Sequence, residues 1–378
     1  MIPRRAPLAG LIVGLAIGAW ANLAARAGQA GSAQLPAALP DEELWQLSQQ
    51  FSEPNGFFPS DNLVSDEPLY RDVVPTIAND GRRNGVYLGV GPEQNFTYIA
   101  ALEPRIAFIV DIRRGNLHLQ LMYKALFELS ADRAEFVSRL FTKSRPAGLG
   151  AASSARDIIA GFWQVRTDPP AAYQANVDAI RQLLVDKHRL PLTDDDWKGI
   201  EYVYYKFYWH GPAITWGSSS GNPMRMPTFG DLMRQTDANG RELSFLASES
   251  AFKVVKDLQA KNLIVPVVGD FAGTKALRAI GDYVRSRNAV ITAFYVSEVE
   301  PYLAEQKRLP AFCANLATLP IAGSSVLIRP PTALTMTLGP ATTLPPASSS
   351  PVMPAIASEV KSCAARSGVQ VQAGRSDS

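Results

Sequence analysis

The sequence is short of the residues that build disulfide scaffolds and metal centres. Only Cys313 and Cys363 are cysteines, and three of the 378 residues are histidines. Two cysteines are too few for a disulfide-rich domain or a four-thiolate zinc site, and three histidines are too few for a histidine-rich centre. We therefore predict no metal site. The two cysteines could pair in an oxidising compartment, although nothing in the sequence supports the geometry of such a disulfide.

A large excess of charge of either sign is also missing. The chain has 37 Lys and Arg against 35 Asp and Glu, a formal net charge of +2. It therefore lacks the strongly basic surface of a general nucleic-acid binder, and we expect no nucleic-acid partner. Hydrophobic residues make up 47% of the chain and charged residues 19%, which is enough apolar material for a packed globular core.

The first 27 residues resemble a targeting segment. Arg4 and Arg5 precede an uncharged run, residues 6–25, that is rich in Ala, Leu, Ile and Gly, and Ala25-Arg26-Ala27 matches a signal cleavage site. The run is also long enough to remain as a membrane anchor. With either outcome we expect the body to lie outside the cytoplasm, as an exported, periplasmic or membrane-anchored protein of the bacterial envelope. The general and the twin-arginine export routes both stay open.

Low-complexity sequence flanks the remaining body. Residues 28–40 are predicted to form a linker. From about residue 339 to residue 378 the chain is dominated by Pro, Ala, Ser and Thr, without a sustained apolar period. Such a composition buries too little surface to offset the entropy lost on ordering. We therefore predict a disordered tail over residues 339–378 and a folded unit over residues 41–331.

A strand, a tight glycine loop and a helix are predicted for residues 85–102. Residues 105–113 follow as a second buried strand, with Asp111 near its end. Gly89 and Gly91 in the loop let backbone N–H groups approach a ligand, and an acid at the end of the next strand can accept both hydroxyls of a ribose. The pattern predicts an adenosine-type site. A simpler alternative stays open, in which the glycines serve only a tight turn and Asp111 caps the next helix.

Strands alternate with helices again in the C-terminal half. Residues 130–240, between the two halves, have helical patterns and little strand character, so we predict a helical insertion there. The alternation is typical of a parallel sheet covered on both faces. The predicted fold class is α/β: a Rossmann-like, mostly parallel sheet with helices on both faces, plus the insertion. Strands are predicted at residues 244–248, 263–268, 289–296 and 324–329, with helices at 249–260, 273–287 and 299–306.

Several segments carry a resemblance to a known family. They are residues 51–67, 87–96 (Tyr87-Leu-Gly-Val-Gly-Pro-Glu-Gln-Asn-Phe), 108–114 (Phe108-Ile-Val-Asp-Ile-Arg-Arg), 265–273 and 293–302. From Trp45 to Pro330 the chain resembles an uncharacterised bacterial family with a class I S-adenosylmethionine-dependent methyltransferase-like fold.

The resemblance implies S-adenosylmethionine as the cofactor. Gly89 and Gly91 would correspond to the cofactor loop and Asp111 to the ribose-binding acid, while residues 61–67 would fold over the cofactor. Tyr87 and Glu93 depart from the usual pattern, in which an acid precedes the glycines and a third glycine follows them. The predicted cofactor-binding residues are Gly89, Gly91, Glu93, Asn95, Asp111 and Arg113, and the candidate pocket residues are Asn62, Glu67, Asp270 and Tyr295.

The predicted export conflicts with the implied cofactor, because S-adenosylmethionine is a cytosolic cofactor. The sequence therefore leaves two functions. One is an exported or membrane-anchored methyltransferase-like protein that binds S-adenosylmethionine, or another adenosine-containing ligand, and methylates an unidentified acceptor. The other is a catalytically inactive envelope protein that uses the same fold to bind a ligand or as a scaffold. We expect a small-molecule ligand in either case, and membrane contact through the N-terminal segment if it is not cleaved.

Overall fold

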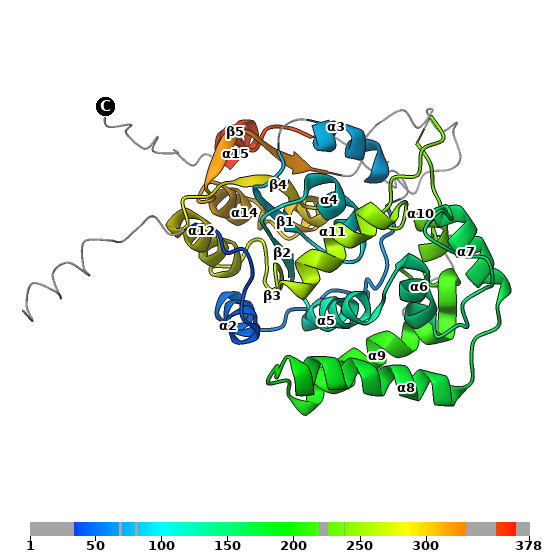
Figure 1. The fold of residues 1–378 in the computed structure, drawn as a ribbon. Helices are drawn as coiled ribbons and strands as arrows, with labels where there is room; N and C mark the ends of the chain where they lie inside the picture. Colours follow the sequence, from blue (N-terminus) through cyan, green and yellow to red (C-terminus); the bar gives the residue numbers. More distant parts are fainter. Residues whose placement is uncertain are drawn as a thin grey trace, which may run out of the picture.

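The computed structural model describes residues 34–67, 70–79, 82–218, 226–237, 239–329 and 353–367 (Figure 1). The leader predicted at residues 1–27 and the first part of the linker lie outside the described residues. Within the described ranges, no helix combines the length and the apolar character needed to cross a membrane.

A five-stranded parallel sheet forms the centre of the fold, with the strand order β3-β2-β1-β4-β5. All four neighbouring pairs are parallel. Strands β1, β2 and β3 are buried along their whole length, as expected when helices cover both faces of a sheet. The predicted α/β, Rossmann-like class is therefore confirmed. The strands are β1 (Val86–Gly89), β2 (Ile106–Asp111), β3 (Ile264–Val268), β4 (Ile291–Tyr295) and β5 (Ile321–Ile328).

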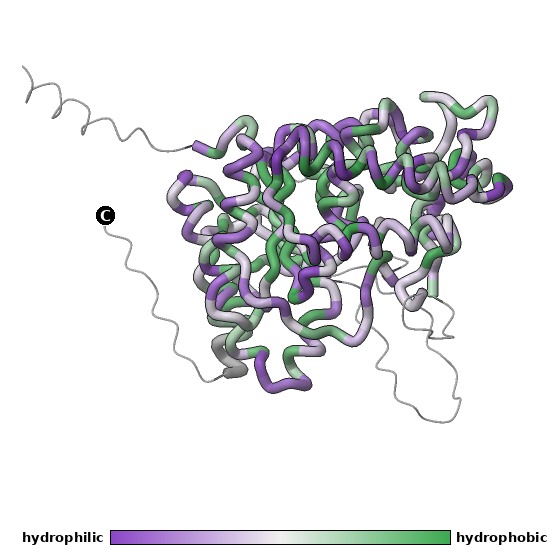
Figure 2. The backbone as a smooth tube through the Cα atoms, turned by 90° about the horizontal axis from the view of Figure 1, so that it is seen from below, coloured by the Kyte–Doolittle hydropathy of each residue, from purple (hydrophilic) through white to green (hydrophobic). Residues whose placement is uncertain are grey.

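The helices that connect the strands form two layers. Helix α11 packs against α4 and α5 along one face, while α12 packs against α2 and α14 on the other. The hydrophobic residues concentrate in the sheet between these layers (Figure 2). The bounds are α2 (Asp41–Phe51), η1 (Tyr70–Val73), α3 (Val74–Asn79), α4 (Gln94–Leu102), α5 (Arg114–Leu129), α11 (Glu249–Ala260), α12 (Ala276–Ser286), α13 (Val299–Glu305) and α14 (Leu309–Leu316).

The segment between β2 and β3 adds further helices beyond α5 and α11. Helix α9 begins at a capping box in which the Thr193 side chain accepts the Asp196 N–H and the Asp196 carboxylate accepts the Thr193 N–H. Asp196 also accepts hydrogen bonds from Arg114 Nε (2.6 Å) and pairs with His118 Nε2 (2.9 Å), so one carboxylate fixes α9 to α5. The helices are α6 (Arg133–Phe141), α7 (Ala155–Gln164), α8 (Pro170–Arg181), the π-helical turn η2 (Gln182–Lys187), α9 (Asp194–His210), η3 (Gly211–Ala213) and α10 (Phe229–Met233).

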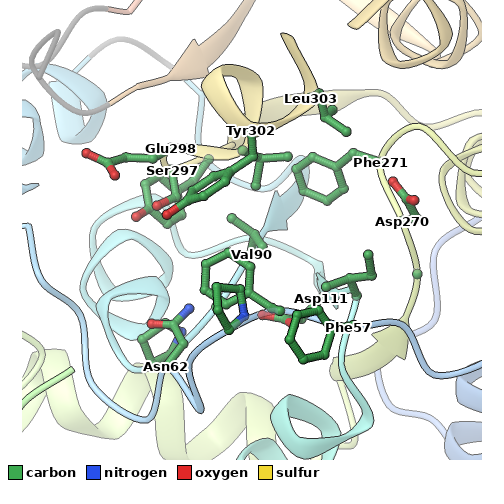
Figure 3. Close-up of a pocket in the computed structure, with 18 of the residues that line it drawn as sticks. Phe57, Asn62, Val90, Asp111, Asp270, Phe271, Ser297, Glu298, Tyr302 and Leu303 are labelled. Atoms are coloured by element: carbon green, nitrogen blue, oxygen red, sulfur yellow. The ribbon is translucent and has the colours of Figure 1, made fainter. Parts of the chain in front are cut away.

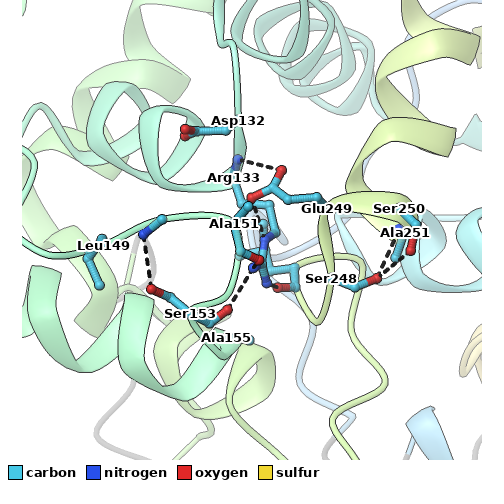
Figure 4. A network of polar contacts seen from close by, with 12 residues as sticks. Asp132, Arg133, Leu149, Ala151, Ser153, Ala155, Ser248, Glu249, Ser250 and Ala251 are labelled. Atoms are coloured by element: carbon cyan, nitrogen blue, oxygen red, sulfur yellow. Dashed lines mark hydrogen bonds and ion pairs between the residues drawn. The ribbon is translucent and has the colours of Figure 1, made fainter.

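A buried arginine ties these added helices to the sheet-covering layer (Figure 4). Arg133, at the start of α6, is only 1% exposed. Its Nε donates to Glu249 Oε1 at the start of α11 (2.8 Å), its Nη1 to Leu246 O (2.6 Å), and its Nη2 to Ser153 O (2.6 Å) and Ala151 O (3.1 Å). Each guanidinium nitrogen therefore has an acceptor, and a carboxylate offsets the buried charge.

The C-terminal segment corrects the expectation of a tail that is disordered throughout residues 339–378. Residues 353–367 contain helix α15 (Ile356–Ser367), which packs against α14 and β5. Ile356 is fully buried and Val360 packs against the core. An apolar stripe at helical spacing therefore anchors this helix, and the surrounding Pro, Ala and Ser composition hides that stripe. The other residues of the predicted tail lie outside the described ranges.

The two cysteines form a disulfide, a pairing for which the sequence offered no geometric evidence. Cys363 on α15 is bonded to Cys313 on α14, and their Cα atoms are 5.6 Å apart. The two residues are 50 positions apart in the chain, so only the packing of α15 on α14 brings them together.

Candidate functional site

A cavity of about 310 Å³ opens at the carboxyl ends of the parallel strands. Gly91 follows β1, Asp111 ends β2, Asp270 follows β3 and Tyr295 ends β4, and all four line the cavity. Asp111 and Asp270 are labelled in the close-up of the cavity (Figure 3). Strands β1 and β4 are neighbours at the centre of the sheet, where the strand order reverses direction. Rossmann-like sheets bind their ligands at this switch point.

The loop after β1 brings its backbone to the cavity wall. Gly91 has a φ of +78°, a conformation that residues with a Cβ rarely adopt. A Cβ added there would also lie 3.3 Å from Asn62 Nδ2. Gln120 on α5 donates from Nε2 to Gly91 O (3.1 Å). Glycine at position 91 is therefore required by the backbone, and its place at the cavity suits close approach of a ligand.

Asn95 holds this loop in shape from the first turn of α4. Its Nδ2 donates to Val90 O (2.9 Å) and Pro92 O (2.8 Å), and its Oδ1 accepts the hydroxyl of Tyr87 (2.8 Å). Tyr87 is fully buried. Tyr87, which stands where an acid usually precedes the glycines, therefore stabilises the loop through Asn95. Asn95 braces the loop from behind and does not line the cavity.

Asp111 projects into the cavity with 5% of its surface exposed. Its Oδ1 accepts the backbone N–H of Arg113 (2.9 Å), and the Arg113 Nε lies 3.5 Å from the same oxygen. Burial raises the pKa of Asp111, and the Arg113 charge opposes that rise. Arg113 itself does not line the cavity. Its Nη1 donates to Asp61 O (2.5 Å), and its guanidinium lies over the ring of the lining residue Phe58 at 5.9 Å.

Residues 57–66 form one side of the cavity, ahead of the sheet in the chain. Asn62, Ser65 and Asp66 line it together with Phe57 and Phe58. Phe57 is 84% exposed, so an aromatic ring lies at the cavity rim with little packing against the protein. Burial also raises the pKa of Asp66.

Glu67 is a buried carboxylate directly behind the cavity wall. Its Oε1 accepts the hydroxyls of Tyr295 and Ser297, both at 2.6 Å, and its Oε2 accepts Gln94 Nε2 at 3.1 Å. These donors are all neutral. Burial raises the pKa of Glu67 to about 7, although the three hydrogen bonds oppose the rise. Tyr295 and Ser297 separate Glu67 from the cavity, so a ligand would contact it only through them.

Glu93 is a second buried carboxylate, placed where the usual pattern has a third glycine. It is fully buried and accepts the backbone N–H of Ser65 (3.3 Å). Burial raises its pKa to about 8. Glu93 therefore joins the start of α4 to residues 62–66, and it does not line the cavity.

The cavity also has residues that the sequence did not single out. One group of them comes from the turn after β4 and from α13, where no glycine motif marks a site. The observation that strand ends meet at one edge of the sheet could have identified Ser297 and Glu298, but Trp216 and Arg308 come from distant parts of the chain. Burial, with the nearby charge of Asp66, raises the pKa of Glu298. The further lining residues include Phe57, Phe58, Trp216, Phe271, Ser297, Glu298, Tyr302 and Arg308.

The structure divides the ten predicted site residues into two groups. Asn62, Gly91, Asp111, Asp270 and Tyr295 line the cavity. The others, Glu67, Gly89, Glu93, Asn95 and Arg113, lie outside the lining. The four that are not glycine form hydrogen bonds with residues that line the cavity. Across the described ranges, no group of three or more His, Cys, Asp or Glu side chains is arranged to hold a metal ion.

Comparison with known families identifies the family of the chain but no activity. A family described as "Domain of unknown function (DUF7790)" matches residues 63–161 and 226–342, which is more than half of the 378 residues. The chain belongs to this family. The DUF7790 match includes β1 to β5 and omits residues 162–225, which hold α8, η2, α9 and η3. No curated protein matches the chain.

Proposed function

We propose that the protein binds an adenosine-containing ligand in the cavity at the strand ends, with S-adenosylmethionine as the first candidate. The observation that carries the proposal is the placement of Gly91 and Asp111 on the same cavity, at the switch point of a parallel sheet. Backbone N–H groups of the loop would approach the ligand, and the Asp111 carboxylate would accept the two ribose hydroxyls.

The charge of the cavity favours S-adenosylmethionine over a dinucleotide. Arg308 is the one Lys or Arg among the described lining residues, and its Nη1 lies 2.5 Å from Asp270 Oδ2. Carboxylates of Asp66, Asp111 and Glu298 face the same space. A pyrophosphate would be repelled there, whereas carboxylates and aromatic rings both attract the sulfonium of S-adenosylmethionine. The protein's part in methyl transfer would be to align the acceptor with the methyl carbon.

Calorimetry with S-adenosylmethionine, S-adenosylhomocysteine and NAD tests this proposal on the purified protein. We expect the two sulfur ligands to bind and NAD to fail. Asp111→Asn should weaken S-adenosylhomocysteine by about tenfold to a hundredfold, because a ribose hydroxyl loses a charged acceptor. Asp282→Asn, an exposed carboxylate on α12, is the matched control and should bind as the wild type does. Absence of binding at millimolar ligand, or affinity that ignores Asp111→Asn, would reject the proposal. Binding without methyl transfer to any acceptor would favour the inactive, ligand-binding alternative.

We also propose that the protein acts outside the cytoplasm. The disulfide between Cys313 and Cys363 supports this location, because disulfides persist in oxidising compartments and are rare in the cytosol. Under this proposal a cytosolic cofactor would travel with the folded protein or be replaced by another adenosine-containing ligand. Fusion of residues 1–40 to a phosphatase that is active only after export should give activity. An inactive fusion, made at normal levels, would contradict export.

A further inference from the structure

One part of the cavity carries carboxylates that no basic side chain neutralises. Asp66 and Glu298 both line it, and neither forms an ion pair with a Lys or Arg among the described residues. Figure 3 shows Glu298 beside Ser297 and Tyr302, across the cavity from Asp111 and Phe57. The proposed ribose contact would occupy Asp111, so Asp66 and Glu298 would remain for a second ligand.

Aromatic rings accompany these two carboxylates. Tyr302 and Phe58 line the cavity and pack edge to face, with ring centroids 5.2 Å apart. Tyr295 adds a third ring. Carboxylates attract a cation by charge and by charge-assisted hydrogen bonds, and aromatic faces attract it through their quadrupole. This combination suits an ammonium group with an apolar body, and it disfavours anions such as carboxylates or phosphates.

We propose that the methyl acceptor is an amine, bound as its ammonium ion between Asp66 and Glu298. This inference rests on the proposed function. The bound ammonium gives one N–H proton to the Glu298 carboxylate, and the nitrogen lone pair then forms a bond to the methyl carbon of S-adenosylmethionine. The methyl–sulfur bond breaks and its electron pair stays on sulfur. The products are the N-methylated ammonium ion and S-adenosylhomocysteine.

The protonation behaviour of Glu298 suits this role. Burial and the charge of Asp66 raise its pKa, which makes the carboxylate a better proton acceptor than an exposed glutamate. An ammonium between Asp66 and Glu298 would also relieve the repulsion of two carboxylates in one partly buried space.

Benzylamine and benzyl alcohol test the inference, because they share a shape and differ in charge. Calorimetry or ligand-observed NMR on the wild-type protein, with and without S-adenosylhomocysteine, should show benzylamine binding at least about tenfold more tightly than benzyl alcohol. Asp66→Asn and Glu298→Gln should each reduce this preference. Both should leave the affinity for S-adenosylhomocysteine within about twofold, because its neutral thioether lacks the sulfonium charge that these carboxylates would attract. Glu305→Gln, an exposed carboxylate on the same helix as Tyr302, is the matched control.

The possible results separate the inference from the proposed function. Equal binding of amine and alcohol to a wild-type protein that binds S-adenosylhomocysteine overturns the amine proposal alone, and this comparison needs no variant to fold. An equal loss of S-adenosylhomocysteine affinity in Asp66→Asn and Glu298→Gln also overturns it, because the carboxylates would then serve the cofactor. Failure of S-adenosylhomocysteine to bind the wild type rejects the proposed function, and the amine acceptor falls with it.

Discussion

Two buried glutamates of this protein have opposite electrostatic surroundings. Glu128, at the end of α5, pairs with Lys124 Nζ and His188 Nε2, both at 2.8 Å. Although burial raises its pKa, the hydrogen bonds and the positive charges lower it to about 2. Glu67 accepts only neutral donors and has a pKa raised to about 7. The buried charge of Glu128, which contributes to helix packing, is neutralised by cations. The buried carboxylate of Glu67, beside the cavity, has no cationic partner among the described residues. Perturbed groups next to a cavity are typical of functional sites.

The largest loss of stability should come from removing the negative charge of Glu128. Glu128→Gln leaves the Lys124 ammonium, which is 2% exposed, with only neutral acceptors. We expect the free energy of unfolding at pH 7 to fall by about 3–5 kcal/mol, measured by chemical denaturation. Glu135→Gln breaks an ion pair with Arg139 whose side chains are about 30% exposed, and should cost less than about 1 kcal/mol. Similar losses for the two variants would show that the Glu128 environment is not special.

The second effect is a pH dependence of stability at Glu67, beside the cavity, where the pKa shift has the opposite sign to that of Glu128. Glu67 binds its proton more tightly in the folded protein, where its pKa is about 7, than in the unfolded chain, where the pKa is near the ordinary glutamate value of 4.5. Its contribution to stability is therefore full below pH 4.5 and is lost as the pH rises through 7. The loss is on the order of 3 kcal/mol. Denaturation at pH 5, 6.5 and 8 should show the decline. Glu67→Gln should remove the part that Glu67 contributes and leave the part from Glu93, whose pKa is also raised by burial. An unchanged slope in the variant would mean that Glu67 is ionised without penalty.

A smaller effect should come from one hydroxyl that donates to Glu67. Tyr295→Phe removes a hydrogen bond that favours the ionised carboxylate, so the free energy of unfolding at pH 8 should fall by about 1 kcal/mol, and by less at pH 5. Tyr123→Phe is the matched control, since the Tyr123 hydroxyl is buried without a hydrogen-bond partner among the described residues. That control should be neutral or stabilising. Equal losses in both variants would exclude a specific role for the Tyr295 hydroxyl.

The sequence predicted the strand-end residues of the site and missed those brought in by packing. Asp111 and Gly91 follow apolar runs that read as buried strands, and parallel strand ends meet at one edge of a sheet. Arg308 and Trp216 carry no such signal, because only the positions of α14 and of the segment after η3 bring them to the cavity. Glu93 and Asn95 were also predicted to bind the cofactor, but their hydrogen bonds hold the loop and residues 62–66 and neither residue lines the cavity.

Burial and composition explain the remaining differences between expectation and structure. Nothing in the local sequence around Glu67 shows that Tyr295 and Ser297, more than two hundred residues later, will enclose it. Helix α15 was missed because Pro, Ala and Ser around it dominate the composition, although Ile356 and Val360 have helical spacing. The packing of α15 on α14 then brings Cys363 and Cys313 close enough to form the disulfide.

A structure of the protein with S-adenosylhomocysteine tests the central claim most directly. We predict that the ligand occupies the cavity at the ends of β1 and β4, with both ribose hydroxyls within hydrogen-bond distance of the Asp111 carboxylate and the backbone of Gly91 against the ligand. A ligand bound elsewhere, or an unchanged empty cavity at saturating S-adenosylhomocysteine, would contradict the assignment of this cavity as an adenosine site.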